Sequence, residues 1–214
     1  MRTIPGICVL LTAAICGLVG GCNEPEKPSG ANQITVNPGA SPSVNGSNED
    51  PSVALDKSPM DMSYYPVEYT KEKMIGRSSE PLVARVIYSR PKKDNRVIFG
   101  DVLKYGAPWR LGANEATEIE FFSNVSINNQ AISKGRYVIY CLPYPDKWQI
   151  RLNTDLYTWG LKIDSAKDAY RFDVAVKKAP VTFERFTMEF EKAPKGMELH
   201  IAWDTLYASV PILY

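Results

Sequence analysis

Apolar and polar side chains alternate over much of the chain beyond residue 80, and this alternation predicts β-strands. From Trp148 to Asn153 every second residue is apolar, as on a strand that buries one face against a core. The same two-residue period, or a short apolar run bounded by turns, predicts further strands at residues 82–88, 116–122, 136–142, 170–177, 186–191, 197–204 and 206–212. The segment 136–142 is apolar on both faces, so we expect it at the centre of a sheet.

The spacing of these strands predicts the fold class. No window of ten or more residues keeps the 3.6-residue period of a helix, and turn residues such as Lys134-Gly135 and Lys195-Gly196 separate the apolar segments. Many short strands joined by turns favour an all-β fold, either an antiparallel β-sandwich or a flattened barrel. A domain of about 150 residues buries close to 70% of its extended surface, which is enough for one self-sufficient core.

The N-terminal segment resembles the signal of a bacterial lipoprotein. Arg2 precedes an apolar run at 7–19, which is too short to cross about 30 Å of hydrocarbon as a helix. The segment ends in Leu18-Val19-Gly20-Gly21-Cys22, which resembles a lipobox because small residues precede the cysteine. We predict a signal peptide at 1–21 and lipidation of Cys22. The alternative is an ordinary secretory signal cleaved at the same small residues.

The next segment has the composition of a flexible linker. Residues 23–60 include 20 Pro, Gly, Ser and Asn among 38 residues, and no aromatic residue precedes Tyr64. Such a segment buries too little apolar surface to offset the entropy of ordering. We therefore expect a lipidated cysteine and disordered tether at 22–60 and an all-β domain at 61–214. This organisation predicts a lipoprotein of the outer membrane, facing the periplasm or the cell surface, with its lipid anchor in the membrane.

Charge and residue types exclude several functions. The chain has 25 Lys and Arg against 24 Asp and Glu, and removal of the signal takes away only Arg2, so no basic excess favours nucleic acid. The one histidine, His200, shares a predicted strand face with Glu198 and Asp204, which is more typical of a solvated sheet face than of a metal site. We expect no metal and no cofactor, because no Cys or His pair at ligand spacing and no phosphate-binding glycine loop occurs.

The cysteines predict neither a disulfide nor a catalytic thiol. Cys8 and Cys16 leave with the predicted signal and Cys22 takes the lipid, so Cys141 remains without an intramolecular partner. Because Cys141 lies within an apolar run, we interpret it as a core residue.

The segment between Ser89 and Glu115 breaks the alternation and predicts one long loop. It is rich in Gly, Pro and Arg, and loops of this length in compact domains are usually functional or disordered. Six apolar or aromatic side chains favour an ordered loop: Val97, Ile98, Phe99, Leu103, Tyr105 and Trp109.

Short motifs in and around this loop carry a family resemblance. They are Ser58-Pro-Met-Asp61, Tyr88-Ser-Arg-Pro91, Arg96-Val-Ile-Phe-Gly-Asp101, Tyr105-Gly106, Trp109-Arg-Leu-Gly-Ala-Asn-Glu-Ala-Thr117, Lys134-Gly-Arg-Tyr137 and the segment 155–160. Over residues 58–212 the chain resembles the bacterial family of unknown function numbered 2911, a group of secreted and lipid-anchored proteins. The resemblance implies an all-β domain and assigns no reaction or catalytic residue.

The long loop also holds the candidate binding residues, which are Arg90, Trp109, Arg110, Asn114 and Glu115. Fork-shaped guanidinium donors beside an aromatic ring suit a sugar or a carboxylated ligand. The alternative is structural: an arginine pairs with Glu115, and Asn114 bonds loop carbonyls, so that the set only holds the loop closed. Asn153, Trp159 and Gly160 suggest a second loop, and the sequence does not show whether the two loops meet.

The sequence alone determines no function and favours binding or scaffolding over catalysis. The expected partner is a glycan or an envelope protein, and the sequence predicts no oligomeric state. A rival hypothesis is a glycan-acting hydrolase, which needs two carboxylates about 5 to 10 Å apart. Glu115 and Asp101 are the only pair we nominate for that role. A third hypothesis, a purely structural protein, applies if the loop encloses no pocket.

Overall fold

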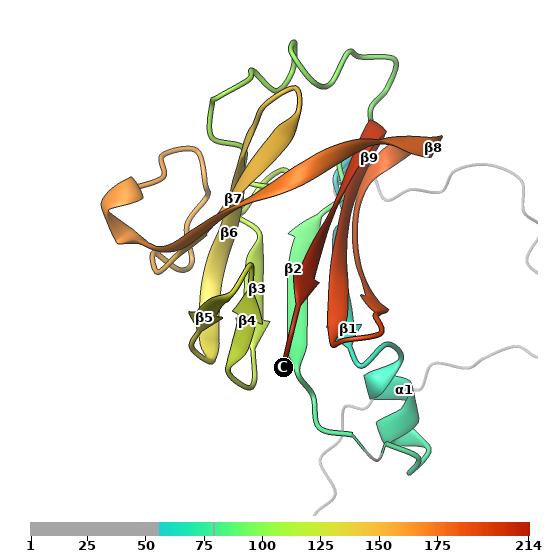
Figure 1. Cartoon of the computed structure of the whole chain (residues 1–214). Helices are drawn as coiled ribbons and strands as arrows, with labels where there is room; N and C mark the ends of the chain where they lie inside the picture. The colour runs from blue at the N-terminus through green and yellow to red at the C-terminus, as the bar shows by residue number, and fades with distance from the viewer. Residues whose placement is uncertain (1–55, 79) are drawn as a thin grey trace, which may run out of the picture. The chain divides into compact units, whose positions relative to one another are not determined.

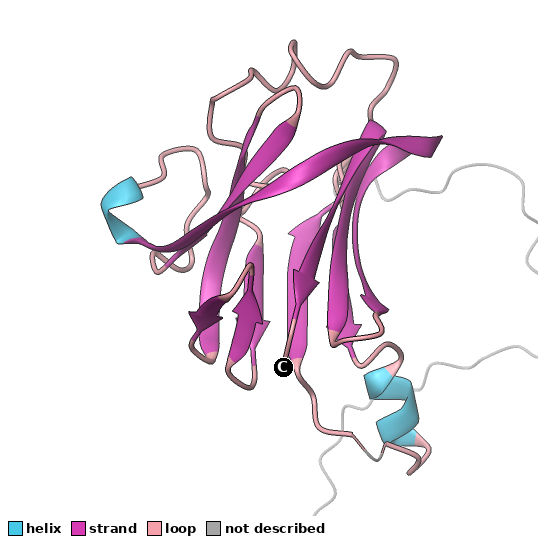
Figure 2. Cartoon of the chain, viewed as in Figure 1, coloured by secondary structure: helices cyan, strands magenta, loops and turns pink. Residues whose placement is uncertain are grey.

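The computed structural model describes residues 56–78 and 80–214 (Figure 1). The predicted signal at 1–21, the lipidation site Cys22 and the tether up to residue 55 lie outside the described residues. The described part is all-β, as predicted, with only two short helical segments among the strands (Figure 2). Within it, no helix has both the length and the apolar character needed to cross a membrane.

Seven antiparallel strands form one sheet that is nearly closed into a barrel, in the order β1-β2-β3-β6-β7-β8-β9. The elements in chain order are β1 (Met60–Tyr65), α1 (Tyr69–Met74), β2 (Ala84–Ser89), β3 (Glu118–Phe121), β4 (Val125–Ile127), β5 (Gln130–Ile132), β6 (Gly135–Pro143), β7 (Lys147–Asn153), η1 (Ser165–Lys167), β8 (Asp168–Lys192) and β9 (Met197–Ile212). Strands β4 and β5 pair only with each other as a separate hairpin within the named sheets.

The strand predicted at the sheet centre is β6, which lies between β3 and β7 in the middle of the seven. Val138, Ile139, Tyr140 and Cys141 are all buried, because this strand is covered on both faces. Burial raises the pKa of the Cys141 thiol well above its ordinary value, which keeps the thiol protonated. The prediction of a buried core cysteine is therefore confirmed.

Two pairs of predicted strands merge in the structure. Residues 170–177 and 186–191 belong to the single strand β8, and 197–204 and 206–212 belong to β9. The pairing of β8 with β9 shifts register on both sides of Phe183. The sequence did not show that 170–177 and 186–191 are one strand, because residues 178–185 interrupt the alternation.

Strand β9 doubles back at Asp204. His200 Nδ1 lies 2.8 Å from Ser209 Oγ, although nine residues of extended strand would separate them by about 30 Å. Asp204 has a φ of 55°, which turns the chain, and in Figure 1 the two halves of β9 run in opposite directions. The Asp204 carboxylate lies 3.7 Å from Lys93 Nζ, whereas His200 Nε2 lies 2.9 Å from the Glu191 carboxylate.

The second half of β8 bends back over the beginning of the sheet. The amide of Phe190 donates to Ser63 Oγ on β1 at 3.1 Å, and the amide of Phe186 donates to the carbonyl of Pro91 just after β2 at 3.0 Å. These contacts bring β8 against both β1 and the start of the long loop.

Candidate functional site

The loop between β2 and β3 is ordered and is fixed to the core along its length. Trp109 exchanges two backbone hydrogen bonds with Cys141 on β6, at 2.7 and 2.8 Å. Of the six predicted anchors, Ile98 and Trp109 are buried, Phe99 and Leu103 pack against the core, and Val97 and Tyr105 are exposed. The loop therefore presents a fixed surface.

Two adjoining cavities lie along this loop, and together we call them the groove. The first, about 720 Å³, is lined by four cations and two carboxylates, and we call it the basic chamber: Lys57, Lys92, Arg96, Arg185, Asp56 and Asp94. The second, about 380 Å³, is mainly apolar, and we call it the apolar trough; its walls include Val102, Leu103, Trp109, Leu161 and Trp203. Pro91, Arg96 and Ala113 border both cavities, so the two lie side by side.

The arginines of the basic chamber are held by backbone carbonyls. Arg96 donates from Nε to the carbonyl of Lys93 at 2.9 Å and from Nη2 to the carbonyl of Lys92. Arg185 donates from Nη1 to the carbonyl of Arg90 at 3.3 Å. Within residues 56–78 and 80–214, neither guanidinium has a carboxylate within 4 Å.

Arg90, the first of the predicted binding residues, lies beside the groove and stabilises the contact between β1 and β8. Its Nη1 is 2.9 Å from the carboxylate of Asp61 on β1. Its Nε donates to the carbonyl of Phe186 at 3.3 Å, and its Nη2 to Thr187 Oγ1 at 3.2 Å, both on β8. Arg90 therefore connects β1 to β8.

Arg110 joins the long loop to a second loop between β7 and β8. Its Nη1 donates to the carbonyl of Trp159 at 2.7 Å, and the amide of Ala116 donates to the carbonyl of Thr158 at 3.0 Å. Burial lowers the pKa of Arg110, and the charge of Glu115 acts in the opposite direction. The two loops meet, which the sequence left open.

Gly160 makes this close approach possible. It has a φ of 74°, and a Cβ atom there would lie 3.0 Å from Cβ of both Ala116 and Arg110. A larger residue would push the second loop away from the groove.

The second loop carries three exposed apolar side chains next to the trough. Tyr157, Trp159 and Leu161 are 81%, 53% and 74% exposed, and Gly160 and Leu161 line the trough itself. We call the two aromatic residues, Tyr157 and Trp159, the aromatic rim. Trp159 was predicted from the sequence to lie in a second loop, whereas Tyr157 was not, although both belong to the 155–160 motif.

The remaining predicted residues lie in or near the groove without a common centre. Trp109 forms part of the trough floor and is only 4% exposed. Asn114 donates to the carboxylate of Asp56 at 2.5 Å and so supports the edge of the basic chamber. Glu115 is exposed and has no ion pair among the described residues, so the expected contact that would seal the loop is absent there.

The nominated hydrolase pair borders neither cavity. Asp101 is exposed and lies 3.4 Å from Lys104 Nζ, its own neighbour on the loop. Glu115 is absent from the lining of both the chamber and the trough. In the part of the chain that the structure describes, no group of three or more His, Cys, Asp or Glu side chains is arranged to hold a metal ion.

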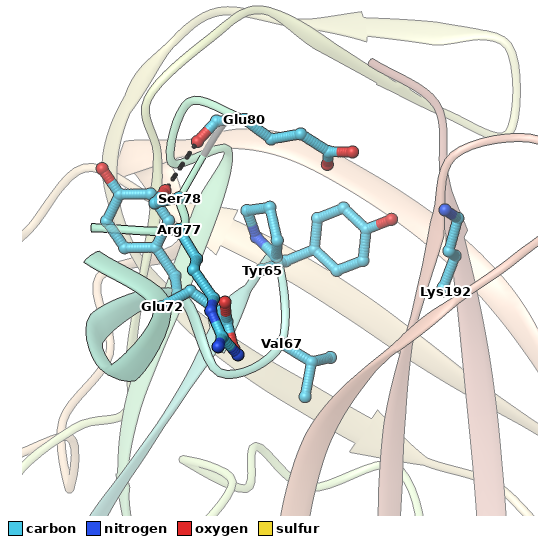
Figure 3. Close-up of a pocket in the computed structure, with 9 residues that line it drawn as sticks. Tyr65, Val67, Glu72, Arg77, Ser78, Glu80 and Lys192 are labelled. Atoms are coloured by element: carbon cyan, nitrogen blue, oxygen red, sulfur yellow. Dashed lines mark hydrogen bonds between the residues drawn. The ribbon is translucent and has the colours of Figure 1, made fainter. Parts of the chain in front are cut away.

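A separate cavity of about 350 Å³ lies beside α1 (Figure 3). Its lining balances Glu72 and Glu80 against Arg77 and Lys192, so it has no net charge to select a ligand. Tyr65 in its wall is buried, its hydroxyl donates to the carbonyl of Gly196 at 3.3 Å, and burial raises its pKa to about 12. The Tyr65 hydroxyl therefore has a structural role, because it is hydrogen-bonded to the backbone.

Comparison with known proteins identifies a family but no function. The family described as "Protein of unknown function (DUF2911)" matches residues 71–212. Comparison with curated proteins and with solved structures found no match. The matched region includes the long loop, the second loop and every strand from β2 to β9. The chain therefore belongs to the DUF2911 family.

Proposed function

We propose that this protein is a glycan-binding lipoprotein of the bacterial cell envelope. The observation that carries the proposal is the aromatic rim beside the groove. Exposed apolar side chains gathered on one loop mark an interaction surface, and ligand sites typically combine aromatic walls with a few polar groups. A sugar ring has apolar C–H faces, so it matches the exposed aromatic side chains of Tyr157 and Trp159.

The rim is positioned by backbone contacts, which favours binding. Tyr157 has a φ of 62° and its amide donates to the Glu118 carboxylate at 3.1 Å, while its ring lies 5.9 Å from the guanidinium carbon of Arg136. The Arg110 bond to the Trp159 carbonyl fixes the other side of the loop. Because the scaffold is already ordered, little entropy is lost when a ligand binds.

The anchor of the proposal comes from the sequence. The apolar segment and Gly20-Gly21-Cys22 support lipidation, and the polar linker supports a tether on which the β-domain reaches a glycan away from the membrane. Incorporation of radiolabelled palmitate by the intact protein, abolished in Cys22→Ser, is the expected result. Palmitate that is absent from the intact protein would contradict lipidation.

Binding is tested with Trp159→Ala and Tyr157→Ala against a glycan array and isolated cell-wall polysaccharide. We expect each variant to bind at least ten times more weakly than the unaltered protein while retaining the same far-ultraviolet circular dichroism. Phe122→Ala is the matched control, because Phe122 is an exposed aromatic residue outside the second loop, between β3 and β4. Retention of full affinity in both rim variants would remove the rim from the binding site.

The hydrolase hypothesis has no comparable support. Asp101 is paired with Lys104 and Glu115 lies outside the groove lining, so the nominated pair does not flank the proposed sugar path. Binding is the function that the geometry favours.

A further inference from the structure

We infer that the ligand of the groove is an acidic glycan, whose carboxylate or sulfate groups enter the basic chamber. This inference rests on the proposed function and adds the chemical class of the ligand. Neutral sugars need only the rim and the trough, so the chamber calls for a separate explanation.

The charge of the chamber is local. Four cations and two carboxylates line it, although the chain as a whole carries a formal net charge of only +1. One of the carboxylates, Asp56, accepts a hydrogen bond from Asn114 at 2.5 Å and so is partly compensated from within the wall. A concave surface with an excess of one charge attracts the opposite charge more strongly than a flat one.

The guanidinium groups are suited to oxyanions. Arg96 is held by two backbone carbonyls and Arg185 by one, which fixes their orientation before a ligand arrives. Nη1 of Arg96 and Nη2 of Arg185 have no hydrogen-bond partner among residues 56–78 and 80–214. Arginine forms paired hydrogen bonds with carboxylate and sulfate oxygens, and these are stronger than bonds between neutral groups.

The placement of Arg96 links the anion to the sugar. Arg96 lines both the basic chamber and the apolar trough, and the trough is also lined by Leu161, which lies two residues after Trp159 in the second loop. A single chain can therefore lie with a ring against the rim and with an acidic substituent in the chamber. The chamber volume of about 720 Å³ falls within the range of about 300 to 1,000 Å³ that is usual for ligand sites.

The test uses one sugar chain in two charge states. The probes are a six-residue oligogalacturonide and the same oligosaccharide after reduction of its carboxylates to primary alcohols, measured by isothermal titration. The inference predicts that the intact protein binds the acidic form at least ten times more tightly. Arg96→Gln and Arg185→Gln should each weaken binding of the acidic form about tenfold. Arg185 lines the chamber and not the trough, so Arg185→Gln should leave binding of the reduced form unchanged.

Arg171→Gln is the matched control, since it removes the same charge from an exposed position on β8 outside both cavities. Its affinity for the acidic form should equal that of the unaltered protein. An oligosaccharide that carries sulfate esters and no carboxylate separates the two oxyanions. Binding as tight as that of the oligogalacturonide indicates a site for either anion, and weaker binding indicates a carboxylate site.

The outcomes separate this inference from the proposed function. If both charge forms bind equally well and Trp159→Ala weakens both, the glycan-binding function stands and the acidic class is overturned. If Arg171→Gln weakens binding as much as Arg96→Gln, the chamber has no specific role and the inference is overturned. If neither form binds, both proposals are overturned.

Discussion

Replacement of Trp109 by alanine tests whether this residue serves the core or the ligand. The indole is 4% exposed and lies within 5.0 to 5.9 Å, centroid to centroid, of four aromatic rings: Phe99, Trp148, Phe186 and Trp203. Removal of a buried tryptophan side chain costs about 3 to 5 kcal/mol, because transfer energy is lost and a cavity is left. We expect the upper part of this range, since the rigid neighbouring rings cannot close around the space.

The measurement is urea denaturation followed by far-ultraviolet circular dichroism, which does not depend on the tryptophan removed. Trp159→Ala is the comparison, because the Trp159 side chain is 53% exposed and its bond to Arg110 uses only the backbone carbonyl. This exposed substitution should change the free energy of unfolding by less than about 0.5 kcal/mol. A loss below about 1 kcal/mol for Trp109→Ala, with a larger loss for Trp159→Ala, would refute the assignment of Trp109 to the core.

Three further predictions concern the fold. Gly196→Ala should destabilise the protein in thermal unfolding by more than Gly76→Ala, for which we expect a loss of roughly 1 kcal/mol. Both glycines have a positive φ, but only at Gly196 would the added Cβ clash, 2.2 Å from the carbonyl oxygen of Ile212. Equal losses in the two variants would exclude the clash. Burial raises the pKa of Tyr88 to about 12 from a free value of 10.0, so between these pH values the folded protein keeps a proton that the unfolded chain loses. The stability that the neutral Tyr88 phenol contributes is therefore complete below pH 10 and is lost as the pH rises toward 12. Tyr88→Phe should therefore flatten the alkaline decline in urea midpoint, and an unchanged decline would contradict this. Arg90→Met should lower the free energy of unfolding by about 1 to 2 kcal/mol, measured in urea, through loss of the partly exposed pair with Asp61, and leave glycan affinity unchanged.

The strands were predictable because each repeats one physical pattern locally. Residues 148–153 and 136–142 match β7 and β6, where burial follows the alternation or its absence. The sequence predicted a boundary between strands 197–204 and 206–212, but the reversal of direction there was not predictable, because only the structure shows the positive φ of Asp204. The six-residue helix α1 also escaped notice, since it buries no side chain and so has no apolar stripe.

The binding surface was predictable only in part. The sequence predicted an ordered long loop, and two of its predicted binding residues, Trp109 and Arg110, line the trough. Arg185 was missed because it lies on β8, far along the chain, and reaches the chamber only where β8 bends back over the loop. Tyr157 was missed because an exposed tyrosine in a loop has no distinctive pattern until its neighbours in space are known.

The structure also changes which substitutions are informative about binding. Trp109 supports the core under the trough, and Arg110 holds the second loop through the Trp159 carbonyl. Loss of binding in a combined Trp109→Ala and Arg110→Ala variant would thus follow from displacement of the rim, whether or not either side chain contacts a ligand. Side chains that are exposed and make no contact essential to the fold give the cleaner result, because their removal alters the surface and leaves its support intact. Trp159 on the rim meets this condition, so its substitution reports on the ligand itself.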